Sequence, residues 1–361
     1  MDQPMEIADL AVSADFLLYG AYGYTGALIA EAAVEQGLRP LLAGRQEEPL
    51  QALAQRLGLP FVALSLSDTP ALEAALAGVP VVLHAAGPYS ATAKPMVEAC
   101  LKTKTHYLDI TGEVEVFEWI AGQDARAQEA GVALLPGVGF DVVPTDCMGA
   151  YVAGKISNPT HLELAFEGAS SVSRGTALTA IENLGKDGMV REDGALKPVS
   201  VAHATRFIDF GKGQRLVAAI PWGDLATAYR TTGIENVITY MSTPPRTYRM
   251  MRAAGQWKWL LKRNWVQRYL KKQVNKRVTG PDAELRETGK SVVWAMARNA
   301  MGDQAEARLV CMEAYQLTVQ ASLAATQRVL KGEVPAGYQT PAGAFGADFI
   351  LGFEGSERID L

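Results

Sequence analysis

Three glycines spaced three residues apart, directly after an apolar run, constrain this chain more than any other feature. The apolar residues 16–19 lead into Gly20, Gly23 and Gly26, and residues 27–34 then have helical composition. A strand, a glycine turn and a helix in this order form the unit whose backbone N–H groups and helix N-terminus receive a dinucleotide pyrophosphate. Although the spacing is not the usual Gly-x-Gly-x-x-Gly, the glycines still permit a tight turn and close approach of phosphates. The predicted contacts with this part of a cofactor are Gly20, Ala21, Tyr22, Gly23, Tyr24, Thr25 and Gly26.

The second predicted strand, residues 39–44, is followed directly by Arg45. Domains that prefer NAD usually carry Asp or Glu about 20 residues past the glycines, where the carboxylate binds the ribose 2′-hydroxyl. In this chain the acids Glu47 and Glu48 are displaced further along. A guanidinium instead suits a 2′-phosphate, through charge-assisted bidentate hydrogen bonds. Arg45 therefore predicts NADP(H) in preference to NAD(H); the alternative is a solvated arginine before a helix over 47–57.

Strands and helices continue to alternate up to residue 135. Further strands are expected at 61–64, 79–84, 106–110 and 131–135, which makes six strands in all. This alternation predicts an α/β fold, a Rossmann-like doubly wound parallel sheet that binds ligands at the carboxyl ends of its strands. Besides the turn and Arg45, the cofactor-binding candidates at these strand ends are Ser67, Asp68, Ala85, Ala86, Gly87, Pro88, Tyr89 and Gly112.

Later residues have a different pattern, with strand-like segments that do not alternate regularly with helices. These segments lie at 161–166, 201–210, 215–220, 234–241, 291–298 and 305–312. They predict a second, α+β domain with a mixed or antiparallel sheet. A long helix is expected over 315–330.

One segment of this second region is strongly basic and aromatic. No acidic residue occurs between Glu235 and Asp282, whereas residues 246–277 carry eleven Lys and Arg. Trp257, Leu261 and Trp265 recur every four residues, so the segment is expected to be a basic amphipathic helix. Such a helix can contact an anionic membrane surface or an acidic carrier. The alternative is a helix whose Trp face packs on its own domain or on the second subunit of a homodimer.

Composition excludes several other classes of protein. The chain has 361 residues, of which 48% are hydrophobic and 20% charged, as in a soluble globular enzyme. A net charge of −5 argues against a nucleic-acid partner, and the four scattered histidines predict no metal site. No basic N-terminal segment leads into a long apolar run, so a cytoplasmic location is expected.

Five N-terminal segments, taken together and in order, carry a family resemblance. They are residues 20–26, 43–45, 87–89, 107–113 and 136–146. This set resembles the saccharopine dehydrogenase-like oxidoreductases, a group that includes the trans-acting enoyl reductases of lipid and polyketide pathways. His84 departs from the pattern, because many relatives would show Asn there.

The resemblance also implies a domain organisation. It is strongest over 16–155 and returns near 315–318 and 337–342, so the final helix and tail are expected to pack against the cofactor domain. We therefore expect a dinucleotide-binding domain of residues 1–156 with a C-terminal return over 315–361. Residues 157–314 form the second domain, for substrate or oligomerisation.

The predicted function is NADPH-dependent hydride transfer to a polarised double bond of a small molecule. The bond is the C=C of an enoyl or lipid-like substrate, or a C=N or C=O bond. One group must stabilise the developing charge and one must supply a proton. The catalytic candidates are Tyr89, Glu113 and Asp141. Their structural alternatives are packing for Tyr89, binding of backbone N–H groups for Glu113, and helix capping for Asp141.

Two other functions remain open from the sequence. Tyr151 and Lys155 match the Tyr-x-x-x-Lys pair of short-chain dehydrogenases, which would make the chain a ketoreductase. However, no Ser lies about 13 residues before Tyr151, and the glycine spacing also differs from that family. The second alternative is an NADP-binding interaction protein without turnover.

Overall fold

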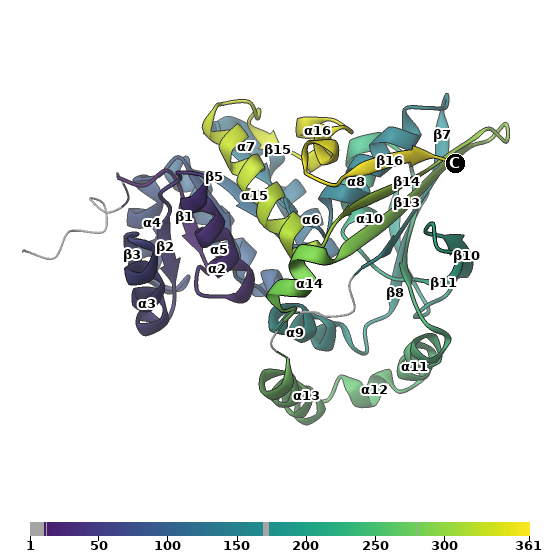
Figure 1. Ribbon diagram of the computed structural model, residues 1–361, viewed down its shortest axis with the longest axis horizontal. Coiled ribbons are helices and arrows are strands. Elements are labelled where there is room, and N and C mark those ends of the chain that lie inside the picture. The colour runs from purple at the N-terminus through teal and green to yellow at the C-terminus, as the bar shows by residue number, and fades with distance from the viewer. Residues whose placement is uncertain (1–10, 12, 169–172, 279) are drawn as a thin grey trace, which may run out of the picture. The chain divides into compact units, whose positions relative to one another are not determined.

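The computed structural model describes residues 11, 13–168, 173–278 and 280–361, which fold into two compact units. Unit 1 contains the described residues up to Phe140 together with Thr318–Ala344, and unit 2 contains Asp141–Leu317 and Phe345–Leu361. Figure 1 shows both units, with labels on the helices and strands for which there is room.

Unit 1 is built on a parallel sheet that has seven strands among the described residues, in the order β15-β6-β5-β4-β1-β2-β3. The strands are β1 (Leu17–Tyr19), β2 (Leu41–Gly44), β3 (Phe61–Ala63), β4 (Val81–His84), β5 (His106–Asp109), β6 (Ala133–Leu135) and β15 (Gly337–Tyr338). The strand order reverses between β1 and β4, which pair in parallel register with Tyr19 opposite His84. Ligands of doubly wound sheets bind at such a reversal point.

Helices connect these strands and bury the sheet. They are α2 (Tyr24–Glu35), α3 (Glu47–Leu57), α4 (Thr69–Ala77), α5 (Tyr89–Thr103), α6 (Val114–Ala121) and α7 (Asp124–Ala130). Every residue of β1, β2 and β4 is buried, which explains their continuous apolar sequence. The six predicted strands and the predicted fold class are confirmed.

The seventh strand, β15, was not among the strands expected from the sequence. It has two residues and pairs in parallel with β6, where Gly337 lies opposite Ala133. Two residues are too few to show any hydrophobic period.

Unit 2 is built on a mixed sheet that has nine strands among the described residues, with a main path in the order β10-β11-β12-β7-β13-β14-β16. The strands are β7 (Pro159–Glu167), β8 (Gly188–Glu192), β9 (Ala195–Val199), β10 (Thr205–Asp209), β11 (Gln214–Ala219), β12 (Asn236–Ser242), β13 (Lys290–Asn299), β14 (Gln304–Met312) and β16 (Glu357–Asp360). Only the pairing of β12 with β7 is parallel among these described strands. The mixed sheet confirms the prediction for the second domain.

The helices of unit 2 include two that pack close to this sheet, α8 (Val143–Ala153) and α10 (Asp224–Thr232). The other helices of unit 2 are α9 (Arg174–Asn183), α11 (Pro245–Gln256), α12 (Lys258–Leu261), α13 (Asn264–Arg277), α14 (Ala283–Thr288) and the short helix η1 (Phe349–Gly352). Helix α15 (Ala314–Leu330) begins in unit 2 and continues into unit 1. The small helix α16 (Pro341–Phe345) ends at the second crossing between the units. None of the helices in the described part of the chain combines the length and apolar composition that crossing a bilayer requires.

The structure divides the chain earlier than the sequence suggested. The predicted boundary lay at residue 156, but α8 already packs on β7 and β13 of unit 2. At the other end, the predicted return over 315–361 is split, because β16 pairs antiparallel with β14 in the sheet of unit 2. Packing of the helix and pairing of the last strand therefore set the two boundaries.

The predicted single helix over 246–277 is wrong. The segment forms three helices, α11, α12 and α13, which break at Trp257 and at Lys262–Arg263. Leu261 consequently does not share one continuous face with Trp257 and Trp265. The spacing of four residues indicated the helical conformation but not the breaks.

Candidate cofactor site

The glycine turn joins β1 to α2 and is held by its own backbone. The N–H of Gly20 donates to the carbonyl oxygen of Ala43 over 2.8 Å, and the N–H of Gly23 donates to that of Gly20 over 2.9 Å. Gly20 has a φ of +88°, which L side chains rarely adopt, and a Cβ on Gly26 would lie 2.2 Å from the Gly20 oxygen. These two glycines are required by the turn itself. Gly23 directly precedes α2, where an anion can meet the N-terminal N–H groups of the helix.

The end of β2 lies beside this turn. The ring of Tyr22 covers Gly44 so closely that a Cβ at position 44 would be 2.6 Å from Tyr22 Cε1. Arg45 follows and is exposed, and the part of the chain that the structure describes offers it no ion pair. Burial raises the pKa of Tyr19 to about 12, and the positive charge of Arg45 opposes that shift. Arg45 therefore stands near the carboxyl ends of β1 and β2 with its guanidinium available to a phosphate.

Ser67 and Asp68 lie between β3 and α4. The Asp68 carboxylate accepts a hydrogen bond from the N–H of Ala71 over 3.2 Å and so caps α4. The hydroxyl oxygens of Ser65 and Ser67 are 2.9 Å apart. These contacts account for the local conformation; contact of Ser67 and Asp68 with a cofactor stays a prediction.

The loop that follows β4 meets the glycine turn. The N–H of Ala85 donates to the Tyr19 carbonyl oxygen over 2.8 Å. A Cβ on Gly20 would lie 2.8 Å from Ala86 Cβ and 2.9 Å from the Ala85 carbonyl oxygen. Thr92 fixes the other side of the loop, because its hydroxyl donates to the Ala86 carbonyl oxygen over 2.7 Å. Two segments far apart in sequence are thus brought together where the strand order reverses.

A buried polar network lies under this loop. The hydroxyl of Tyr107 donates to Asp109 Oδ2 over 2.6 Å and is 3.3 Å from His84 Nδ1. Asp109 Oδ1 also accepts from the N–H groups of Thr111 and Gly137, at 3.0 and 2.9 Å. Burial lowers the pKa of His84 to about 3, so this imidazole is neutral at pH 7. Burial raises the pKa of Asp109 to about 6, although its hydrogen bonds oppose the shift.

Sequence reasoning did not find this network as a unit. Tyr107 and Asp109 are two residues apart on β5, so their side chains point to the same face of the sheet. The register of β4 and β5 then places His84 opposite Asp109. The alternation was visible in the sequence, but the register between two parallel strands was not.

Tyr89 and Glu113, both predicted to be catalytic, hold the start of α5. The Glu113 carboxylate accepts from the N–H groups of Tyr89 and Ser90, at 2.8 and 3.0 Å. The Tyr89 hydroxyl donates to the His84 carbonyl oxygen over 3.1 Å, and its side chain is buried. Both arrangements favour the structural alternatives. Gly112 lies between Thr111 and Glu113, directly after β5, as expected from the sequence.

Asp141 is the first residue of unit 2 and follows directly on Phe140 of unit 1. Burial raises its pKa to about 7. No hydrogen bond of its carboxylate occurs among the described residues. The N-cap of α8 is Val142 and no side chain caps the helix, so the capping alternative has no support. Within unit 2, burial and the charge of Asp146 raise the pKa of Asp224 well above its usual value, with Asp141 adding to the effect. Of the three catalytic candidates, Tyr89 and Glu113 therefore belong to unit 1 and Asp141 belongs to unit 2.

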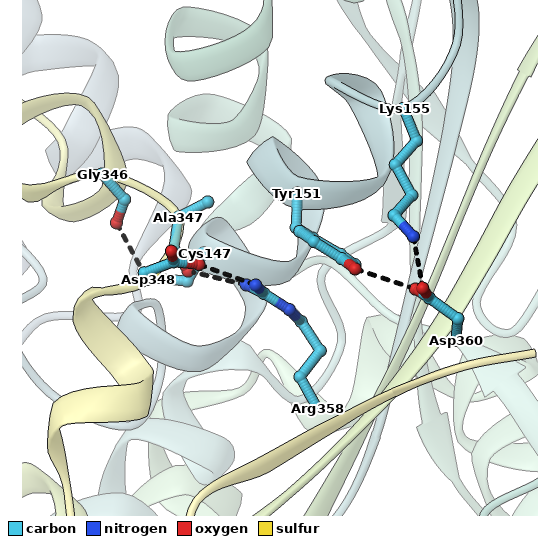
Figure 2. Close-up of polar contacts among 8 residues, drawn as sticks. All are labelled: Cys147, Tyr151, Lys155, Gly346, Ala347, Asp348, Arg358 and Asp360. Atoms are coloured by element: carbon cyan, nitrogen blue, oxygen red, sulfur yellow. Dashed lines mark hydrogen bonds and ion pairs between the residues drawn. The ribbon is translucent and has the colours of Figure 1, made fainter.

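Tyr151 and Lys155 both contact one carboxylate of the last strand (Figure 2). The Tyr151 hydroxyl donates to Asp360 Oδ1 over 2.9 Å, and the Lys155 ammonium forms an ion pair with Asp360 Oδ2. Arg358 stacks over the Tyr151 ring at 3.4 Å from its centroid and pairs with Asp348 at 2.7 Å. Tyr151 and Lys155 thus hold β16 against α8 within unit 2. This structural role gives no support to the short-chain dehydrogenase alternative.

Unit 1 also has a pocket of about 600 Å³, which lies apart from the glycine turn and the loop after β4. It is lined by residues of α4, α5 and α7, and none of the predicted site residues lines it. Its charged groups pair with one another, Lys102 with Glu73 and Arg126 with Glu98. Over the described residues, no group of three His, Cys, Asp or Glu side chains is placed to hold a metal ion.

Comparison with known proteins identifies the N-terminal unit. Residues 16–135 match the family model described as the saccharopine dehydrogenase NADP binding domain. Most of unit 1 is thus similar to this NADP-binding domain. The match includes the glycine turn, Arg45 and the loop after β4, and it confirms NADP(H) as the predicted cofactor.

The chain is also similar to several known proteins. The chain is 36% identical over 140 residues to a trans-acting enoyl reductase of Mycobacterium tuberculosis, which covers 37% of this chain and 34% of that protein. It is 29% identical over 215 residues to a saccharopine dehydrogenase-like oxidoreductase of Mus musculus, covering 51% of this chain and 50% of the relative. The chain thus spans about a third to a half of the length of these relatives.

The fold of the whole chain also has a known counterpart. Apo saccharopine dehydrogenase (L-Glu forming) from Saccharomyces cerevisiae superposes with a TM-score of 0.64 over 97% of this chain and 100% of its own. The two sequences are 15% identical, so the likeness concerns the fold.

Proposed function

We propose that this chain is an NADPH-dependent oxidoreductase that reduces a polarised double bond of a small molecule, the C=C bond of an enoyl or lipid-like acyl group. The observation that carries the proposal is the meeting of the glycine turn, Arg45 and the loop 85–89 at the reversal point of an NADP-binding domain. The similarity to a mycobacterial trans-acting enoyl reductase supports the enoyl substrate.

The residues at this edge fit the proposed cofactor. Gly20 and Gly26 let the turn fold tightly against itself and against the loop after β4, and α2 points its N-terminus at the same turn. In the proposal, residues 20–26 bind the pyrophosphate, Arg45 binds the 2′-phosphate and residues 85–89 lie along the nicotinamide. When bound, the cofactor supplies the hydride that the substrate receives at one end of its double bond.

Asp141 is the proposed proton donor. A carboxyl group with a pKa near 7 is still half protonated at neutral pH, which suits a general acid. Tyr89 and Glu113 are committed to other groups, whereas Asp141 has no hydrogen bond among the described residues. In the proposed step its proton passes to the substrate atom that does not receive the hydride. The product is the saturated group, with NADP⁺ and the Asp141 carboxylate.

A substrate panel tests the proposal. The protein is mixed with NADPH and, separately, an enoyl thioester, a cyclic imine and a ketone, and oxidation of NADPH is followed by its near-ultraviolet absorbance. We expect turnover with the enoyl thioester. Binding of NADPH without oxidation by any of the three would instead support the non-catalytic NADP-binding alternative.

A further inference from the structure

The helices α11, α12 and α13 present exposed aromatic side chains among cations. We call residues 245–277 the basic aromatic row. Trp257, Trp259, Trp265 and Tyr269 are between 55% and 62% exposed. The rings of Trp257 and Trp259 lie near each other, with centroids 6.5 Å apart. Packing of the Trp face on its own unit, one alternative from the sequence, is therefore wrong.

The aromatic side chains are exposed even though the row packs against the rest of its unit. On α13 the residues of one face, Val266, Leu270 and Val274, are half-buried, and Gln267 on the same side donates to the Ile181 carbonyl oxygen over 3.1 Å. At α12, Leu261 Cβ lies 3.5 Å from the position of a Cβ on Gly185. Helices α12 and α13 thus use their other face for internal packing, while Trp259, Trp265 and Tyr269 stay exposed.

The exposed faces are also strongly positive. On α13, four exposed residues follow one another at intervals of three or four and so lie on the same face of the helix: Trp265, Arg268, Lys272 and Lys276. The sequence from 236 to 281 contains no acidic residue to balance the eleven cations. Lys258 forms an ion pair with Asp187, outside the segment, at 2.8 Å. Figure 1 shows the three helices following one another along one side of unit 2.

We propose that the basic aromatic row binds the surface of an anionic phospholipid bilayer. Indole and phenol rings favour the interface between headgroups and acyl chains, and Lys and Arg are attracted to anionic headgroups. A second copy of the row is a poor occupant, because each copy brings eleven cations and no acid. Aromatic residues spread over successive helices suit an extended layer better than a compact acidic carrier protein. This inference is independent of the proposed function, since binding can be measured without turnover.

The test uses sedimentation of the whole protein with vesicles of equal parts phosphatidylglycerol and phosphatidylcholine, at low salt. We expect the native protein to sediment with them, to stay in solution with pure phosphatidylcholine, and to be released as salt shortens the Debye length. Replacing Arg263, Arg268, Lys272 and Lys276 by Gln should lower the partition coefficient by at least about 100-fold. A Trp259→Ala, Trp265→Ala variant should also lose binding.

A matched control has the same loss of charge outside the row. Its four substitutions to Gln are at exposed lysines elsewhere in the chain: Lys104, Lys212, Lys290 and Lys331. This variant should bind the anionic vesicles within about threefold of the native protein, because surface potentials act within a Debye length. All variants should keep the native circular dichroism spectrum.

Three outcomes would overturn the proposal. The first is a native protein that does not sediment with anionic vesicles at low salt. The second is a control variant that loses binding as much as the row variant. The third is a native protein that binds an acidic acyl carrier protein or forms a dimer through Trp265 while ignoring vesicles.

Discussion

Arg45 is the side chain that we propose sets the choice of cofactor. It is exposed at the end of β2, and its positive charge reaches the neighbouring Tyr19 hydroxyl. We expect Arg45→Ala to weaken NADP binding by about 1.5–3 kcal/mol, because a charge-assisted hydrogen bond to the 2′-phosphate is lost. NAD affinity should hardly change. Titration calorimetry with both cofactors measures this, and equal weakening of both would refute the assignment; Arg56→Ala, on an exposed residue paired with Glu31, is the control.

Asp141 gives a second prediction at the residue scale, from its pKa of about 7. In the proposed step the acid form donates the proton, so turnover should fall as pH rises through about 7. Asp141→Asn should reduce turnover by about 100-fold or more and abolish this limb of the profile, while leaving NADPH affinity unchanged.

The control for this variant is Tyr151→Phe, which removes only the hydroxyl bound to Asp360. It should keep the native rate and pH profile. Loss of turnover in Tyr151→Phe, together with full activity in Asp141→Asn, would favour the short-chain dehydrogenase alternative after all.

At the level of secondary structure, the glycines between β1 and α2 have two different roles, one in packing of the turn and one in the proposed binding of the pyrophosphate. A Cβ on Gly26 would lie 2.2 Å from the Gly20 oxygen, whereas one on Gly23 would lie 3.1 Å from it. Gly26→Ala should therefore destabilise the protein by about 1–3 kcal/mol through overpacking. Gly23→Val should lower the melting temperature less than Gly26→Ala does but weaken NADP binding at least about tenfold, since the branched side chain enters the pyrophosphate space.

Thermal melts and NADP titrations of both variants distinguish these roles. A Gly23→Val protein that is folded and binds NADP as tightly as the native protein would remove the turn from the cofactor site. The strand itself tolerates little change either, because all three residues of β1 are buried.

At the scale of the whole molecule, unit 1 is assembled from two separate stretches of chain. β15 pairs with β6, and the described part of α15 in this unit contributes the fully buried Ala321, Leu323 and Ala325. Gln36 on the α2 side is 2.9 Å from Gln327, and the Phe140 N–H donates to Thr318 over 3.0 Å. Residues 1–140 alone should therefore lose core packing that the complete unit has.

This predicts the behaviour of two fragments. Residues 1–140 alone should melt without a sharp transition, while residues 1–140 joined by a flexible linker to 318–344 should unfold cooperatively and bind NADP. Circular dichroism melts and NADP titration compare them. Equal stability of the two fragments would mean that the returning segment adds nothing to unit 1.

Features that depend on neighbours along the chain could be predicted from the amino-acid sequence. Apolar runs between helices specified the parallel sheet, the spacing of three glycines specified the turn after β1, and Arg45 indicated the cofactor. Each signal lies within a few residues, because hydrophobic period, backbone freedom and charge are local properties.

Features that depend on residues far apart in the sequence became evident only in the folded structure. It placed His84 opposite Asp109, paired β15 with β6, and assigned α8 and β16 to unit 2. It also broke the basic segment into three helices and left Trp257, Trp259 and Trp265 in solvent. Strand register, edge pairing and side-chain burial arise from contacts between distant segments, and no local pattern encodes which segments meet.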